Sequence, residues 1–375
     1  MPPLKTPPLQ NQQGHTILYV QGSHFEMGFQ HGKFLKEKIQ RNIQQHLKKK
    51  PETTSELKEK RLAKFLKALP CVISYIPQKY IEEMHGLAEG SETDFNDILL
   101  LNLFPEMFHC CGITASHNAS IDGSLYHARV LDYSEGKDLQ SSAVLIIAKP
   151  NECHSFMNVT YAGFIGSVTG MNEKKIAIGE IGGQGYEHWD GMPMSFLLRS
   201  ILEKANTLDE AKDILIRTPR TCEYYYVISD GNSESAFSCY ATDSQIHFLS
   251  PGENYSISPP LQENLNLIIE KDLSSNPEAS FFKQPENMIL LTGLSSPERY
   301  PLLLERVEAL WGTLNEKSLM EIIQSPVSRE SNLHNAIFHP ASLTLWVSHA
   351  GLNGEPACTQ EYVQFSYEDL KQNFD

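Results

Sequence analysis

Residues 109–133, HCCGITASHNASIDGSLYHARVLDY, decide the fold. Apolar and polar residues alternate on both sides of an Asp-Gly pair, which is typical of the turn between two antiparallel strands. The stretch therefore predicts a β-hairpin whose second strand returns Arg129 and Asp132 to the start of the first. That start carries two adjacent cysteines, Cys110 and Cys111.

The hairpin brings together the groups of a nucleophilic site. A thiol becomes a nucleophile when a base takes its proton or when positive charge lowers its pKa. His109 is predicted to point to the opposite face of the strand, which argues against a Cys-His pair. Cleavage of the His109–Cys110 bond would instead give Cys110 an α-amine with a pKa of about 7.7–8.0, suitable for a general base. Arg129 would then favour the thiolate, and Asp132 would hold the ammonium form of the amine.

A structural interpretation of the same residues stays open. Free cysteine is among the most buried residue types, and we expect Cys111 to be a small core residue that faces away from Cys110. Arg129 and Asp132 could form a plain ion pair with no catalytic role, since such pairs also perturb pKa values.

The hairpin separates a helical segment from a β-rich one. Residues 1–109 are predicted to be mostly helical, after a disordered lead-in over 1–14 and a short strand over 17–22. Beyond residue 110 the predicted strands come in blocks with helix pairs between them, which favours an α+β layered body. A long loop is expected over 251–290. The strands are predicted at 142–149, 154–163, 175–183, 223–230, 235–242, 245–250 and 342–349, and the helices of this part at 193–206, 208–218 and 295–314.

Composition restricts the classes of function. The net charge of −15 argues against a nucleic-acid partner. No apolar stretch approaches the ~18–20 residues of a membrane span, and the first residues are polar where a signal peptide would be apolar, so we expect a cytoplasmic protein. The seven cysteines are odd in number and lack CxxC spacing, which indicates reduced thiols. Neither a metal nor a cofactor is expected; His24, Glu26 and His31 fit a capped helix start better than a metal site.

A series of motifs in the same order resembles the isopenicillin-N acyltransferase (acyl-CoA:6-aminopenicillanic acid acyltransferase) family, peptidase family C45, of the N-terminal-nucleophile (Ntn) hydrolases. The chain is more distantly similar to choloylglycine hydrolases and acid ceramidase. Within the hairpin, Cys110-Cys111-Gly112-Ile113 matches the opening of the family's mature chain, and Arg129 with Asp132 matches its close. The other motifs are GSHFEMGFQHG (22–32), MHGLAEGSE (84–92), FIGSVTGMNEKKIAIGEIG (164–182), GMPMSFLLRSILEKANTLDEAKDIL (191–215), SSPERYPLLLERV (295–307) and HNAIFHPASLTLWVSHA (334–350).

The resemblance implies a four-layer αββα Ntn-hydrolase sandwich over 110–375, with 1–109 as a helical pro-segment. It implies that the chain cuts itself between His109 and Cys110 and keeps the pro-segment as a heterodimer partner. The expected activity is that of a cysteine amidohydrolase or acyltransferase. Its substrate would be a small-molecule acyl amide or acyl donor, with Cys110 as the nucleophile.

The chain also departs from the family pattern. Val130 replaces the usual Asn, and Gly182 stands where choloylglycine hydrolases carry an Asn of the oxyanion hole. The main chain of Gly182 and Gly183 could donate in its place, Tyr225 is the candidate for a second family Asn, and Arg299 matches an arginine near the substrate. These departures leave open a non-catalytic, unprocessed binding module on the same fold. A lipid-ester hydrolase of the phospholipase B-like kind would differ by substrate only.

Overall fold

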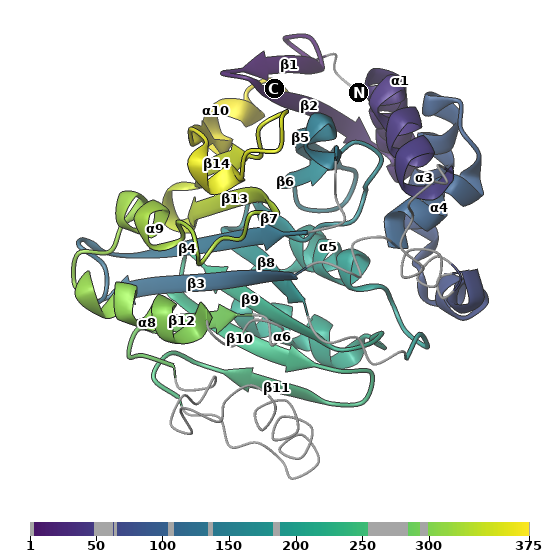
Figure 1. The fold of residues 1–375 in the computed structure, drawn as a ribbon. Coiled ribbons are helices and arrows are strands. Elements are labelled where there is room, and N and C mark those ends of the chain that lie inside the picture. The colour runs from purple at the N-terminus through teal and green to yellow at the C-terminus, as the bar shows by residue number, and fades with distance from the viewer. Residues whose placement is uncertain are drawn as a thin grey trace.

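The structure is a computed structural model, and it describes residues 4–48, 63, 66–103, 109–133, 138–182, 188–253, 284–292 and 299–374. Two sheets form its centre (Figure 1). The nine-stranded sheet has the order β1-β2-β5-β6-β7-β8-β9-β10-β11, and the six-stranded sheet has the order β12-β3-β4-β13-β14-β15. All neighbouring strands are antiparallel except β2 and β5, which are parallel.

The strands of the nine-stranded sheet are β1 (Leu9–Gln12), β2 (His15–Gly22), β5 (Ala143–Pro150), β6 (Phe156–Tyr161), β7 (Thr169–Asn172), β8 (Ile176–Gly182), β9 (Tyr224–Asp230), β10 (Ser235–Ala241) and β11 (Ile246–Leu249). Those of the six-stranded sheet are β3 (His109–His117), β4 (Gly123–Asp132), β12 (Met288–Thr292), β13 (Asn332–His339), β14 (Thr344–His349) and β15 (Val363–Ser366). The main helices are α1 (His24–Ile43), α3 (Gln78–Ser91), α4 (Phe95–Leu103), α5 (Met194–Lys204), α6 (Leu208–Arg217), α8 (Arg299–Ala309), α9 (Glu316–Ile322) and α10 (Tyr367–Lys371).

The predicted hairpin is confirmed as β3 and β4. Its register pairs Gly112 with Arg129 and Cys110 with Leu131. Gly112 faces the other sheet: a Cβ built on it would lie 2.9 Å from side-chain atoms of both Ile181 and Val227. The hairpin is therefore pressed against β8 and β9, and a larger residue at 112 would force the two sheets apart.

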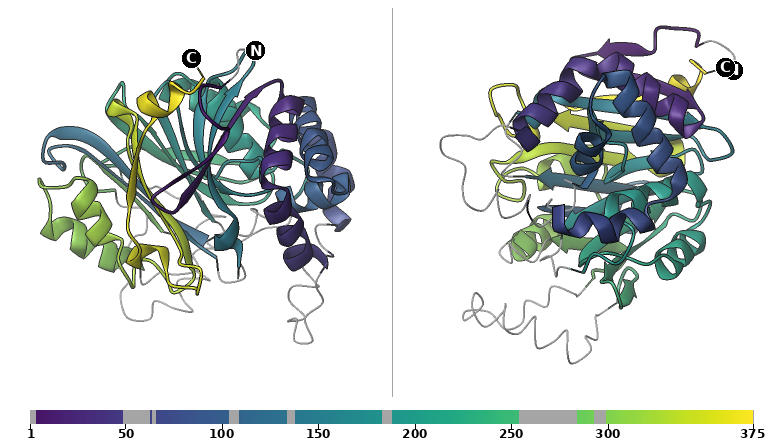
Figure 2. Two further views of the ribbon diagram at one scale, coloured as in Figure 1. Left: turned by 90° about the horizontal axis from the view of Figure 1, so that it is seen from above. Right: turned by 90° about the vertical axis from the view of Figure 1, so that its right-hand side faces the viewer.

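The predicted αββα layering is also confirmed for the described residues. Helices α5 and α6 pack on the nine-stranded sheet at β7, β8 and β9, whereas α8 and α9 pack on β12 and β13 of the six-stranded sheet. Figure 2 shows α8 and α9 on one side of the molecule and α1 with α3 on the opposite side.

The first hundred residues contribute strands as well as helices. The prediction of a disordered lead-in is wrong for β1, which pairs with β2 at the edge of the sheet. An edge strand is held by backbone hydrogen bonds, so the polar sequence LQNQ gave no apolar signal for it. The sheet continues across to β5 through the parallel pairing of β2.

Helices α1 and α3 cross at unusually short range. A Cβ built on Gly28 would lie 1.9 Å from the carbonyl oxygen of Glu83, and one built on Gly86 would lie 2.1 Å from that of Phe25. These glycines let the two backbones touch where any side chain would separate them. Helix α1 begins with a capping box between Ser23 and Glu26, which confirms the capped helix start predicted there.

One further expectation needs correction. The long loop predicted over 251–290 ends earlier than residue 290, because Met288–Thr292 form strand β12 beside β3. Residues 254–283 lie outside the described residues. The short apolar run MILLT carries no alternation, so periodicity alone did not distinguish it from a loop end.

Candidate active site

The Cys110 thiol lies in a buried cluster with one arginine and one carboxylate. Arg129 Nη2 is 2.8 Å from the Cys110 sulfur and 3.2 Å from Glu180 Oε2. The same Glu180 oxygen is 3.5 Å from the sulfur. All three residues are fully buried. Arg129 Nε and Nη1 have no hydrogen-bond partner within the described part of the chain, so the guanidinium keeps donor capacity for a reacting group.

The local charges act on the thiol in opposite directions. Burial raises the pKa of Cys110 well above its ordinary value, and Arg129 is the main group that opposes this shift. Glu180 and Asp132 raise the pKa further, whereas a hydrogen bond from the backbone of Gly182 lowers it. In this structure the thiol is therefore protonated at neutral pH, with Arg129 and the Gly182 N–H in place to donate to a thiolate.

Cys111 belongs to a second cluster. It pairs with Val130 in the hairpin register, and Arg299 of α8 hydrogen-bonds its side chain. Arg299 Nη2 also lies 2.8 Å from Asp132 Oδ2. Burial raises the pKa of Cys111 to about 11, against the opposing effect of Arg299. Cys111 is buried and on the other face of the strand from Cys110, as predicted, but it lies beside Arg299 and Asp132 and not among apolar side chains alone.

The alternative left open above, a plain ion pair between Arg129 and Asp132, is not what the structure shows. Arg129 pairs with Glu180, and Asp132 pairs with Arg299. In a regular strand, side chains three residues apart point to opposite faces, so the side chains of Arg129 and Asp132 lie on opposite faces of β4. Asp132 lies directly opposite His109 in the register and also accepts a hydrogen bond from the Arg329 N–H at 3.2 Å. Its carboxylate is thus held by Arg299 and by the backbone of Arg329.

The residues predicted for the oxyanion hole and for substrate binding lie at different places relative to Cys110. Gly182, at the end of β8, donates its backbone N–H toward the Cys110 sulfur. Gly183 lies outside the described residues. Tyr225 pairs with Ile181, a residue that faces Gly112, and its hydroxyl donates to Glu223 at 3.3 Å. Tyr225 is therefore on the sheet face that meets the hairpin.

Glu180 was missed by the sequence analysis. It is a carboxylate inside an otherwise apolar strand, IAIGEIG, and a buried charge in such a run is the signal that could have singled it out. The departure at Val130 lies opposite Cys111 in the hairpin, so that position belongs to the second cluster and not to the Cys110 side.

The comparisons with known proteins relate part of the chain to one enzyme family. Residues 122–255 match the model of the family described as acyl-coenzyme A:6-aminopenicillanic acid acyl-transferase. The resemblance to this family predicted from the sequence is thereby confirmed over this part of the chain.

Individual relatives are remote. Protein dcd1B of Dictyostelium discoideum is 25% identical over 395 residues, covering 95% of this chain and 74% of that protein. Bovine acid ceramidase is 27% identical over 201 residues, covering 46% of this chain and 49% of the enzyme. Mouse N-acylethanolamine-hydrolyzing acid amidase is 27% identical over 167 residues, covering 42% of this chain and 45% of that enzyme. The chain thus spans about half the length of these two enzymes.

Among solved structures, the Caenorhabditis elegans N-acylethanolamine-hydrolyzing acid amidase ortholog superposes with a TM-score of 0.47 at 17% identity. The match covers 62% of this chain and 93% of that structure. Within the described residues, no helix is both long and apolar enough to cross a membrane.

Proposed function

We propose that this chain is a self-cleaving cysteine amidohydrolase or acyltransferase, whose nucleophile is Cys110 and whose substrate carries an acyl group on a non-peptide amide nitrogen. The observation that carries the proposal is the buried contact of the Cys110 sulfur with Arg129 at 2.8 Å, immediately after the predicted cleavage point. An arginine at this distance stabilises the thiolate form, which is the nucleophilic form of cysteine.

Self-cleavage would begin with attack of the Cys110 sulfur on the carbonyl carbon of His109. A thioester forms between these atoms, the peptide C–N bond breaks, and the nitrogen of Cys110 takes a proton and becomes its α-amine. Water then hydrolyses the thioester, which leaves a carboxylate on His109 and a free thiol on Cys110. Asp132, which pairs with His109 in the hairpin register, is the candidate to hold the new ammonium group.

The mature enzyme would repeat this chemistry on its substrate. The thiolate attacks the amide carbonyl of the substrate, and the α-ammonium group gives its proton to the departing amine. Arg129 and the N–H of Gly182 are the candidate donors for the negative charge that develops on sulfur or on the carbonyl oxygen. Water as acceptor completes hydrolysis, and an amine as acceptor completes transfer.

Two cysteine variants test the proposed cleavage. Purified wild type should give two fragments of about 12 and 30 kDa by intact mass, in proportion to the 42.3 kDa chain. Cys110→Ala should stay full length, whereas Cys111→Ala, the matched control one residue away, should still be cut. Cleavage of the Cys110→Ala chain, or a mature sequence that starts elsewhere than CCGIT, would contradict the proposal.

The substrate class is tested with the processed protein. Acid ceramidase and N-acylethanolamine-hydrolyzing acid amidase are among the relatives, so N-acyl amines are the first compounds to assay, beside N-acyl amino acids and lysophospholipids. Release of free acid from amides only would support an amidohydrolase, and release from lysophospholipids only would indicate a lipid-ester hydrolase. A wild-type chain that is never cut and acts on none of these would favour the binding module that the departure at Val130 leaves open.

A further inference from the structure

The parts of the candidate active site are divided between the two sheets. Cys110 and Arg129 belong to β3 and β4 of the six-stranded sheet, whereas Glu180 and the N–H of Gly182 belong to β8 of the nine-stranded sheet. A group that acts on a reacting atom must be held to within about 0.5 Å. The 3.2 Å contact between Arg129 and Glu180 therefore depends on whatever fixes one sheet against the other.

One buried histidine bridges the sheets beside this site. His334 of β13 lies in the same row of the six-stranded sheet as Cys110, because Leu131 pairs with both residues. Its Nε2 lies 2.9 Å from the hydroxyl oxygen of Thr169 on β7, and its Nδ1 lies 3.0 Å from the hydroxyl oxygen of Tyr161 on β6. All three of these side chains are buried, so loss of either hydrogen bond would leave a polar group without a partner in the interior.

The His334 ring is neutral, which fixes how it can bond. Burial lowers its pKa well below the usual value, and Arg129 on β4 and His349 on β14 lower it further. A neutral imidazole has one donor and one acceptor nitrogen, so it can accept from one hydroxyl and donate to the other. The bridge is consequently complete throughout the neutral range of pH.

The Thr169 end of this bridge leads to Glu180. Val168, the residue before Thr169, accepts the N–H of Glu180 through its carbonyl oxygen at 3.0 Å. Thr169 begins β7 and pairs with Gly179, the residue before Glu180. A Cβ built on Gly179 would lie 2.9 Å from Cγ of Arg129, so this backbone passes close to the arginine. The segment that the histidine holds is therefore the one that carries Glu180.

We propose that His334 is a positioning residue of the candidate active site, which holds the backbone at 168–169 against β13 and thereby places the Glu180 carboxylate beside Cys110. The inference rests on the proposed function, and it adds a residue that acts through Glu180 and not on the thiol itself. Because the bridge runs between the sheets, its loss frees Glu180 while the hairpin that carries Cys110 keeps its own pairing.

The first test measures the backbone of Glu180 in the Cys110→Ala chain, so that self-cleavage plays no part. Thr169→Val removes the hydroxyl with little change of shape, Thr169→Ser keeps a hydroxyl, and His334→Phe removes both bonds. Amide hydrogen exchange is followed by NMR for the Glu180 N–H and, as an internal reference, for the amides of β10 and β11. We expect Thr169→Val and His334→Phe to speed exchange at Glu180 at least about ten-fold, and Thr169→Ser to change it less than about three-fold. An unchanged rate in Thr169→Val, or an equal rise in β10 and β11, would overturn the proposal.

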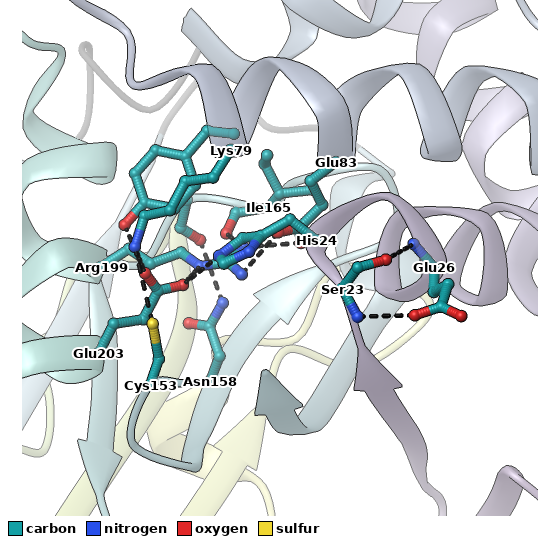
Figure 3. A network of polar contacts seen from close by, with 12 residues as sticks. Ser23, His24, Glu26, Lys79, Glu83, Cys153, Asn158, Ile165, Arg199 and Glu203 are labelled. Carbon is teal, nitrogen blue, oxygen red and sulfur yellow. Dashed lines mark hydrogen bonds and ion pairs between the residues drawn. The ribbon is translucent and has the colours of Figure 1, made fainter. Parts of the chain in front are cut away.

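His24→Gln is the matched control for a buried histidine. His24 Nε2 lies 3.1 Å from Glu203, in a separate buried cluster that also contains Arg199 (Figure 3). The side chains that mainly shift the pKa of Cys110 belong to the other cluster. His24→Gln should therefore leave the exchange rate at Glu180 within about two-fold, even where the urea midpoint falls. A rise as large as that of Thr169→Val would mean that any loss of packing loosens Glu180, which would also overturn the proposal.

The second test asks whether the bridge acts through Glu180 in the reaction. The Glu180 charge raises the pKa of Cys110, so release of this carboxylate should move the pH–rate profile of self-cleavage to lower pH. Thr169→Val should shift the profile in the same direction as Glu180→Gln, and it should add no further shift in a chain that already carries Glu180→Gln. Additive shifts would overturn the proposal, because a general loss of packing acts independently of Glu180.

The two tests separate this inference from the proposed function. A wild-type chain that is never cut would contradict the proposed function, and the exchange rates in the Cys110→Ala chain would still decide the role of His334. A wild-type chain that cuts itself, with unchanged exchange at Glu180 in Thr169→Val, would keep the proposed function and overturn the positioning role.

Discussion

At the scale of single residues, the two adjacent cysteines differ because strand geometry sends them to opposite sides of one sheet. Cys110 meets Arg129 and Glu180 between the sheets, and Cys111 meets Arg299 under α8. Sequence alone could propose Cys110 as nucleophile and Arg129 as its partner. It could not show that Glu180 lies beside Cys110, because the two residues are 70 positions apart in the chain.

Arg129→Met tests the arginine that contacts the thiol. Without this positive charge the thiol pKa rises further, and a donor to the developing anion is lost, so we expect self-cleavage to slow by about 100-fold or more. The fraction cut over time on a denaturing gel measures it, with far-UV circular dichroism as a check of folding. Arg217→Met, at an exposed ion pair of α6, is the control. Cleavage of Arg129→Met at the wild-type rate would remove the arginine from the mechanism.

Glu180→Gln tests the carboxylate that the sequence analysis missed. The Glu180 charge raises the pKa of Cys110, so its replacement by a neutral amide should lower that pKa. The pH–rate profile of self-cleavage should consequently move to lower pH, and the measurement is the cleavage rate between pH 5 and 9. A shift in the opposite direction would show that Glu180 acts as a base for the thiol and not as a repelling charge.

At the scale of elements, the crossing of α1 over α3 depends on glycine. Gly28→Ala would place a methyl group 1.9 Å from the carbonyl oxygen of Glu83, so the helices must separate. We expect a loss of about 1–3 kcal/mol in the free energy of unfolding, as is usual for overpacking. The urea midpoint measures it, and Glu37→Ala at an exposed position of α1 should leave it nearly unchanged. Equal midpoints for both variants would contradict the close crossing.

Helices and strands were predictable where apolar residues recur at helical spacing or alternate with polar residues. The hairpin, the strands after it and the helix pair at 193–218 all showed alternation or helical spacing, and all are present. Five strands lie outside the predicted strand ranges: β1, β7, β12, β13 and β15. Of these, β1 is polar and β12 is a short apolar run without alternation. Both are held by pairing with a neighbouring strand, which is a tertiary contact.

At the scale of the whole molecule, buried histidines make the fold sensitive to acid. Burial lowers the pKa of His31, His127 and His349 to about 3 each. Unfolding returns each to a pKa of about 6.5, so the unfolded state binds more protons between these values. These histidines therefore do not reduce the free energy of unfolding above pH 6.5. As the pH drops from 6.5 toward 3, they lower it by up to about 1.4 kcal/mol per pH unit for each histidine.

His31→Gln tests one of these groups. The glutamine carbonyl can accept the N–H of Gly163, which His31 Nε2 accepts at 3.0 Å, yet it cannot be protonated in this range. The loss of stability between pH 7 and 5 should be smaller in this variant than in wild type, measured by urea unfolding at each pH. His188→Gln, at an exposed position, should keep the wild-type slope. An unchanged slope in His31→Gln would mean that other groups govern the acid response.

The sequence by itself determined the hairpin, the layered α+β class, the family resemblance and the candidate nucleophile, because each rests on local spacing or on motif order. The tertiary structure decided which charges meet. It pairs Arg129 with Glu180, Asp132 with Arg299, and Arg199 with Glu83, which is far away in the chain. The physical reason is that an ion pair in the interior forms between whichever side chains the packed sheets and helices bring within a few ångströms, and separation along the chain carries no record of that distance.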